Sequence, residues 1–181
     1  MGISTALTLS ALLLFGPSTK AYLSELQVSL EGRRVEVSFE LIDGLSDELF
    51  ERIQTGLASG FTFEFVLVRD QKAWIDNKLA RSELEVVAMY NAVTREFLVN
   101  FKQDGKLVDS RIARDRDELE VAMTEFERLT VFNLEGISPD KRILVRARAE
   151  VGSKTTMLII PSRITTDWAR SRRFHAPAEE P

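Results

Sequence analysis

The sequence predicts a mainly β protein of the α+β class: an antiparallel β-sandwich, or a strongly curved sheet, with two covering helices. The first observation is a strand-like run in which Phe61, Phe63, Phe65 and Leu67 alternate with other side chains, so that the large groups share one face. The second is that similar alternation recurs in short runs separated by turn signals such as Asp104-Gly105. Hairpins this close together predict antiparallel pairing.

The third observation is that only two segments have helical spacing. The first begins at Ser46, a good N-cap residue, and places Leu49, Phe50, Ile53 and Leu57 on one stripe. The second begins near Asp115 and its apolar stripe is predicted to run as far as Leu129. The members of that stripe are Leu119, Ala122, Met123, Phe126 and Leu129. Both helices are short, so each must pack on the sheet to be stable.

The C-terminal third is predicted to form a connector, a strand pair and an extension. Residues 131–137 are an apolar connector, and Ile143, Val145, Ala147, Ala149 and Val151 line one face of a long strand. After a turn and a short return strand, residues 164–174 form a polar extension that carries Trp168.

The N-terminal segment is predicted to be a signal peptide of residues 1–21, with cleavage after Ala21. An apolar run from Ile3 to Phe15 is followed by Gly16-Pro17, and it is short for a membrane span. The alternative is a buried N-terminal helix or strand, because no Lys or Arg precedes the run. We therefore predict a periplasmic or otherwise exported protein with a single antiparallel β-rich domain at 22–174, a flexible tail at 175–181 and no transmembrane helix in the mature chain.

Composition excludes several kinds of chemistry. The 181-residue chain has no Cys and one His, which argues against thiolate nucleophiles, His-rich metal sites and Ser/His relays. The formal net charge of −4 argues against nucleic acid as a partner. No catalytic, metal-ligating or cofactor-binding residue is predicted, and no cofactor is expected.

Several runs together resemble an uncharacterised family of exported bacterial proteins, the domain-of-unknown-function family numbered four-three-nine-zero. The runs are Gly56-Leu57, Gly60 to Arg69, Trp74 to Asp76, Tyr90 to Val99, Asp117 to Leu129, Val145 to Ala149, and Asp167-Trp168. Their order and spacing cover nearly all of the predicted mature chain. The resemblance implies an exported protein and brings no established activity.

A basic strand face is the first candidate interaction surface. Arg142, Arg146 and Arg148 alternate with the apolar residues of the strand from 143 to 151. Such a face suits an anionic membrane surface or an acidic envelope protein. The alternative is a solvated face whose arginines pair with Glu36, Glu40 or Glu64 on neighbouring strands.

Two further groups complete the candidate surface. Trp74 and Asp76 lie with Asp70 in a polar stretch after the Phe-rich strand; either they bind a ligand or the Trp anchors a loop. Trp168, with Arg172 and Arg173, forms either a docking tail or a plug that closes the end of the core.

The leading functional hypothesis is a non-enzymatic cell-envelope protein, a binding module for another protein or for the membrane surface. The alternative is a carrier of a small apolar ligand, because Phe-rich sandwiches can enclose cavities. A hydrolase that uses only carboxylates, Asp70 and Asp76, is the third hypothesis. The oligomeric state does not follow from the sequence.

Overall fold

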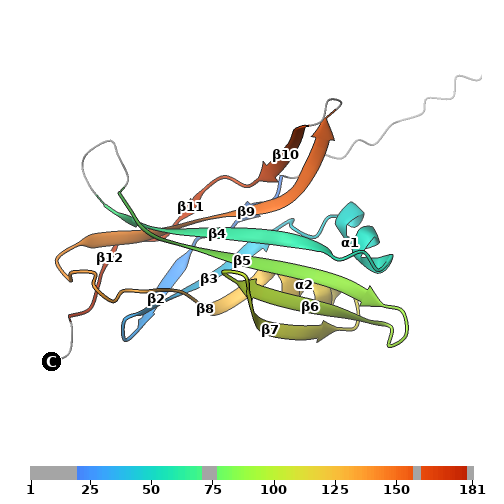
Figure 1. Cartoon of the computed structure of the whole chain (residues 1–181), viewed down its shortest axis with the longest axis horizontal. Helices are drawn as coiled ribbons and strands as arrows, with labels where there is room; N and C mark the ends of the chain where they lie inside the picture. Colours follow the sequence, from blue (N-terminus) through green and yellow to red (C-terminus); the bar gives the residue numbers. More distant parts are fainter. Residues whose placement is uncertain (1–19, 71–76, 157–159, 179–181) are drawn as a thin grey trace, which may run out of the picture.

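Two antiparallel sheets face each other in a computed structural model of the chain, which describes residues 20–70, 77–156 and 160–178. The sheets do not close into a barrel, and two short helices accompany them (Figure 1). The predicted fold class, a mainly β sandwich or curved sheet with two helices, is confirmed. Residues 1–19, and with them nearly all of the predicted signal peptide, lie outside the described residues.

The smaller sheet is built around β3 (Arg34–Ile42). β1 (Tyr22–Leu23) and β2 (Gln27–Glu31) follow one another along one edge of β3, because their registers continue each other. β8 (Glu125–Asn133) pairs with the other edge, with two irregularities in register. The tight turn between β2 and β3 contains Gly32, whose φ of +57° favours glycine.

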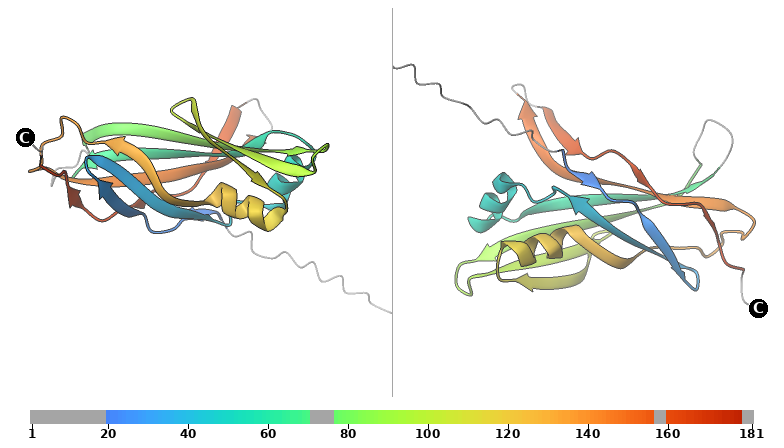
Figure 2. Two further views of the ribbon diagram at one scale, coloured as in Figure 1. Left: turned by 90° about the horizontal axis from the view of Figure 1, so that it is seen from below. Right: turned by 180° about the vertical axis from the view of Figure 1, so that it is seen from behind.

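The larger sheet has the order β10-β9-β4-β5-β6-β7, and every pair in it is antiparallel. β11 and β12 continue the line of β10 along the same edge of β9. The bounds are β4 (Ser59–Arg69), β5 (Asn77–Asn91), β6 (Glu96–Gln103), β7 (Lys106–Ala113), β9 (Arg142–Thr156), β10 (Ile160–Thr165), β11 (Ala169–Arg170) and β12 (Phe174–His175). Figure 2 shows the two layers edge-on and from behind.

The core fills the space between the sheets with aromatic side chains. Phe39 of the smaller sheet lies 5.3 Å from Phe63 and 5.6 Å from Phe65 of the larger sheet, measured between ring centroids. Phe126 on β8 stacks on Phe39 at 4.9 Å. The predicted inward face of β4 is confirmed, since Phe61, Phe63, Phe65 and Leu67 are all at most 2% exposed.

The sheets also meet at two edges. At one, Leu26 forms a parallel bridge with Ser171, and the Ser171 amide donates to the carbonyl of Val145 at 2.9 Å. At the other, the Gln103 side chain of the larger sheet donates to the Thr130 carbonyl of β8 at 2.8 Å. The sandwich is therefore held by hydrogen bonds at its sides as well as by its apolar interior.

The helices begin where the sequence predicts and end sooner. α1 (Asp47–Gln54) is capped by Ser46, which accepts from the Leu49 amide at 3.2 Å. The predicted stripe member Leu57 is 58% exposed and lies beyond the helix.

α2 (Arg116–Thr124) is capped by Asp115, which accepts from the Glu118 amide at 2.9 Å. The prediction that its stripe continues to Leu129 is wrong, because Phe126 and Leu129 belong to β8. β-branched and aromatic residues follow Thr124, and the open edge of β3 gives them strand partners.

The chain after residue 131 also differs in detail from the prediction. The first part of the predicted connector, as far as Asn133, belongs to β8. The predicted extension contains the end of β10, all of β11 and the start of β12. Packing continues past the predicted boundary at residue 174: His175 pairs with Arg142, and Ala176 is buried. Within the described residues, no helix is long and apolar enough to cross a membrane.

Candidate functional site

Charged side chains gather on the outer face of the larger sheet, where β4, β5, β9 and β10 lie side by side. Glu64 on β4 stands directly opposite Arg148 on β9 and Glu83 on β5. Since side chains alternate along a strand, the neighbours Phe63 and Phe65 enter the core and Glu64 faces outward. The buried aromatic face of β4 thus fixes the position of the charged face.

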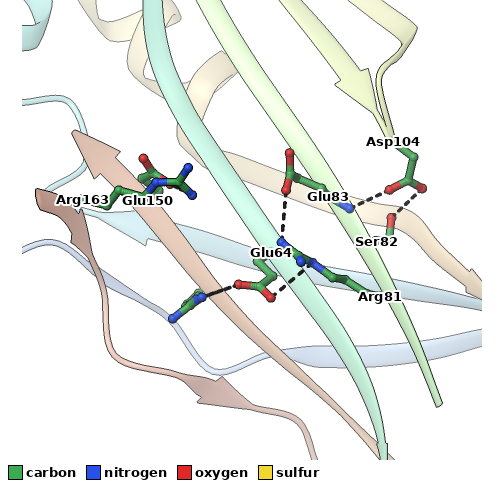
Figure 3. Close-up of polar contacts among 8 residues, drawn as sticks. Glu64, Arg81, Ser82, Glu83, Asp104, Glu150 and Arg163 are labelled. Atoms are coloured by element: carbon green, nitrogen blue, oxygen red, sulfur yellow. Dashed lines mark hydrogen bonds and ion pairs between the residues drawn. The ribbon is translucent and has the colours of Figure 1, made fainter. Parts of the chain in front are cut away.

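Glu64 is the centre of an ion-pair network (Figure 3). Its Oε2 lies 2.8 Å from Nε and 2.6 Å from Nη2 of Arg148, and its Oε1 lies 3.3 Å from Nε of Arg81. The Glu64 side chain is only 15% exposed, so both carboxylate oxygens are used by arginines in a partly desolvated position. Arg81 also reaches Glu83 at 3.4 Å.

The turn between β6 and β7 fixes the β5 side of the network. Asp104, at a φ of +48°, accepts from the Glu83 amide at 2.8 Å and from the Ser82 hydroxyl at 3.1 Å (Figure 3). On the far side, Arg163 of β10 pairs with Glu150 of β9 at 3.4 Å.

These side chains line a groove of about 250 Å³. Its lining consists of Thr62, Glu64, Arg81, Glu83, Arg148, Glu150, Arg163 and Thr165. The charged members are three arginines and three glutamates, so their formal charges cancel. A groove with balanced charge suits a partner that carries both signs, and it does not select a purely anionic ligand.

Trp168 borders the same face. The Arg146 and Arg148 guanidiniums lie 4.8 Å and 4.6 Å from the centroid of its ring. At such distances the ring face attracts both cations. The half-buried Trp168 is thereby held beside the charged groove, which Arg148 also lines. Three residues predicted for the surface, Arg146, Arg148 and Trp168, are brought together.

The other predicted surface residues lie elsewhere. Arg142 and Arg173 both approach Asp70, at 4.0 Å and 2.9 Å. Arg172 approaches Glu25 at 3.6 Å, beside a second groove of about 440 Å³ near the junction of the two sheets. Trp74 and Asp76 lie outside the described residues.

The alternative reading of the basic face is correct in part. Arg148 pairs with Glu64, as that reading expects, but Glu36 lies on the smaller sheet and pairs with Arg128 at 2.8 Å. The sequence did not identify Arg81, Glu83 or Arg163 as members of the site. Arg81 and Glu83 alternate with buried residues, which is the one signal of an outward position, but their partners depend on the register between strands.

A comparison with known families identifies the family of the chain. The family described as domain of unknown function DUF4390 matches residues 18–171, which include Trp168 and every strand except β12. The chain belongs to the DUF4390 family. Among curated proteins no relative matches this DUF4390 protein, and among solved structures none does. In the described part of the chain, no cluster of three or more His, Cys, Asp or Glu side chains could hold a metal ion.

Proposed function

We propose that this DUF4390 protein is a non-enzymatic binding module of the cell envelope, and that it binds another protein through the charged groove and Trp168. The observation that carries the proposal is the Trp168 ring held by Arg146 and Arg148 beside a groove of balanced charge. Trp and Arg are the residues that most often dominate the binding energy of protein interfaces. Alternating charges at the rim favour a partner with complementary charges of both signs.

The same contacts favour a protein over an anionic membrane surface. Arg148, Arg163, Arg142 and Arg173 each have a carboxylate within 4.0 Å. A lipid headgroup would compete with carboxylates of the protein itself for these arginines. The aromatic contacts across the two sheets likewise give no support to the carrier of a small apolar ligand.

A pull-down from an envelope extract tests the proposal. We expect Trp168→Ala and Arg163→Ala to reduce recovery of the same partner at least tenfold relative to wild type. Arg114→Ala is the matched control, because Arg114 is 74% exposed and pairs with Glu96 at 3.9 Å, whereas Arg163 is 76% exposed and pairs with Glu150 at 3.4 Å. Equal recovery by all four proteins would contradict the proposed surface.

Vesicle flotation separates the protein partner from the membrane surface. We expect no flotation with vesicles of phosphatidylglycerol and phosphatidylethanolamine. Flotation that Trp168→Ala and Arg163→Ala abolish, and Arg114→Ala does not, would replace the proposed protein partner by the lipid surface.

Export is tested by the mature N-terminus. We expect protein from its own host to begin at Tyr22, which is also the first residue of β1. Intact-mass measurement checks the prediction. A full-length mass would contradict cleavage after Ala21. Such a chain would also retain Lys20, which pairs with Asp167 at 3.4 Å.

A further inference from the structure

β7 ends the larger sheet, on the side away from β9. Within the described ranges, no strand pairs with its outer edge. Every residue of β7 except Ala113 is exposed, and Leu107, Val108 and Ile112 are 63%, 54% and 61% exposed. An edge strand of this kind offers backbone N–H and C=O groups to another strand.

An apolar row runs to this edge on the outer face of the sheet. Met89 of β5 stands opposite Leu98 of β6, and Leu98 stands opposite Ile112 of β7. Their exposed fractions are 40%, 37% and 61%. The row ends at the unpaired edge, so a strand added there with an apolar residue opposite Ile112 would extend it.

The other face of β7 carries one acid and one base, two residues apart. Asp109 and Arg111 stand opposite Phe101 and Val99 of β6, and the Arg111 guanidinium lies 4.6 Å from the centroid of the Phe101 ring. Arg111 Nε and Asp109 Oδ2 are 3.0 Å apart. Ser110 lies between them and faces outward with Asn100.

We propose that β7 pairs with the β7 of a second copy, antiparallel and about a twofold axis at Ser110. This register places Asp109 of each copy opposite Arg111 of the other. It places Val108 opposite Ile112, which extends the apolar row across the seam. In this arrangement the acid of each β7 therefore faces the base of the other, so the charges of the two copies are complementary.

The charges also exclude the neighbouring symmetric registers. An axis at Asp109 would place two carboxylates directly opposite each other, and an axis at Arg111 would do the same with two guanidiniums. Like charges directly opposite each other are destabilising in a strand pair. The alternation of Asp109, Ser110 and Arg111 therefore selects the axis at Ser110 from these three.

In the single chain, one backbone hydrogen-bond donor of this edge already has a local partner. The Ser110 amide donates to Asp109 Oδ1 at 2.8 Å, and a bulge interrupts β7 near Val108. Pairing with a second copy exchanges that local bond for bonds between the two backbones. We therefore expect a dimer that dissociates on dilution. It leaves the charged groove open, because the groove is lined by β4, β5, β9 and β10, and β6 separates these strands from β7.

Sedimentation velocity over a range of concentrations tests the pairing. We expect wild type to form dimers as concentration rises, and Asp109→Arg to weaken self-association at least tenfold because it places two arginines opposite each other. The exchange Asp109→Arg/Arg111→Asp restores opposite charges in the same register and should restore the dimer. A monomer at every soluble concentration, or a dimer that Asp109→Arg leaves unchanged, would overturn the proposal.

Cysteine cross-linking tests the axis directly, since the chain has no cysteine. Ser110→Cys places the thiol opposite its own copy, at a separation that suits a disulfide. Ser29→Cys is the control, an exposed serine on an edge strand of the other sheet. We expect rapid oxidation to a covalent dimer for Ser110→Cys alone. Equal rates for the two variants, or protection of Ser110→Cys by a different protein seated on β7, would argue against the second copy.

Discussion

Glu36 is the most deeply buried carboxylate among the described residues, although it lies on the outer face of the smaller sheet. It is 5% exposed and accepts from Arg128 Nε at 2.8 Å and from the Ser29 hydroxyl at 3.2 Å. Arg128 adopts a φ of +51° near an irregularity in the β3–β8 register. A non-glycine residue rarely holds this angle without compensation. The contact with Glu36, and the bond from the Arg128 amide to Ser38 at 3.0 Å, supply that compensation.

Because of this ion pair, the free energy of unfolding should decrease when the protein is acidified. The hydrogen bond from Arg128 lowers the pKa of Glu36 below its ordinary value, although burial of the carboxylate opposes this. A carboxylate with a lower pKa in the folded state stabilises the protein above its unfolded-state pKa of about 4.3. That contribution is lost as the pH falls through the lower, folded-state pKa. We therefore expect the urea concentration at the midpoint of unfolding to be lower at about pH 3 than at about pH 7.

Glu36→Gln isolates the contribution of this one group. The variant should have a lower urea midpoint at neutral pH and a smaller change in midpoint on acidification than wild type. Glu40→Gln is the control, because Glu40 is an exposed carboxylate on the same face of the same strand. A Glu36→Gln variant with the pH profile of wild type would show that other carboxylates carry the acid sensitivity.

At this scale the sequence predicts which face a residue occupies better than it predicts its partner. Alternation along the strand placed Arg146 and Arg148 on the outer face, and both lie there against Trp168. The Glu36–Arg128 pair was not foreseen, because two irregularities in the β3–β8 register decide which side chains meet. Bulges depend on tertiary packing, and this chain carries no local signal for them at β8.

At the scale of elements, the backbones of β4 and β5 approach each other closely at Gly60. A Cβ atom at Gly60 would lie 1.8 Å from the carbonyl oxygen of Val86 and 2.9 Å from its carbonyl carbon. Gly60 does not have a positive φ, so the close approach of the two backbones is the reason for glycine here. β4 is the central strand that supports both the Phe face and Glu64.

We expect Gly60→Ala to destabilise the protein by about 2–3 kcal/mol, because the obstructing atoms are backbone and must separate two paired strands. Gly105→Ala is the comparison: nothing lies within 4 Å of a Cβ there, but its φ is +80°. That change should cost about 1–2 kcal/mol from backbone strain alone. Urea unfolding measures both, and a smaller loss at Gly60 than at Gly105 would refute the argument from close approach.

The boundary between α2 and β8 shows why the ends of elements were harder to predict than their starts. The start of α2 near Asp115 was predictable because the Asp115 side chain acts within its own turn. The end of α2 at Thr124 has no such local signal, since Phe126 continues both a helical and a strand pattern. Pairing of β8 with β3 decides between the two, and that contact joins residues about ninety positions apart.

At the scale of the whole molecule, the segment after β10 joins the two sheets. Ser171 bridges to Leu26 and bonds to Val145, and Phe174 pairs with Ile143. From the other sheet, the Arg33 guanidinium donates to the carbonyl of Pro177 at 2.9 Å. This segment was expected to be a polar extension because it contains few apolar residues. Its order comes from the edge of β9, which the segment itself does not encode.

We expect a chain that ends at Thr165 to lose cooperative unfolding and to aggregate, whereas a chain that ends at Ala178 should unfold like the full-length protein. The shorter chain lacks β11 and β12 and leaves the edge of β9 at Ile143, Val145 and Ala147 without a partner, and such edges recruit other chains. Thermal unfolding and light scattering measure both properties. Because the shorter chain also lacks Trp168, Trp168→Ala in the full-length chain is the control and should not aggregate. If the Thr165 chain unfolds as cooperatively as the Ala178 chain, the sheets are held by the apolar core alone and the segment after β10 serves only the outer surface.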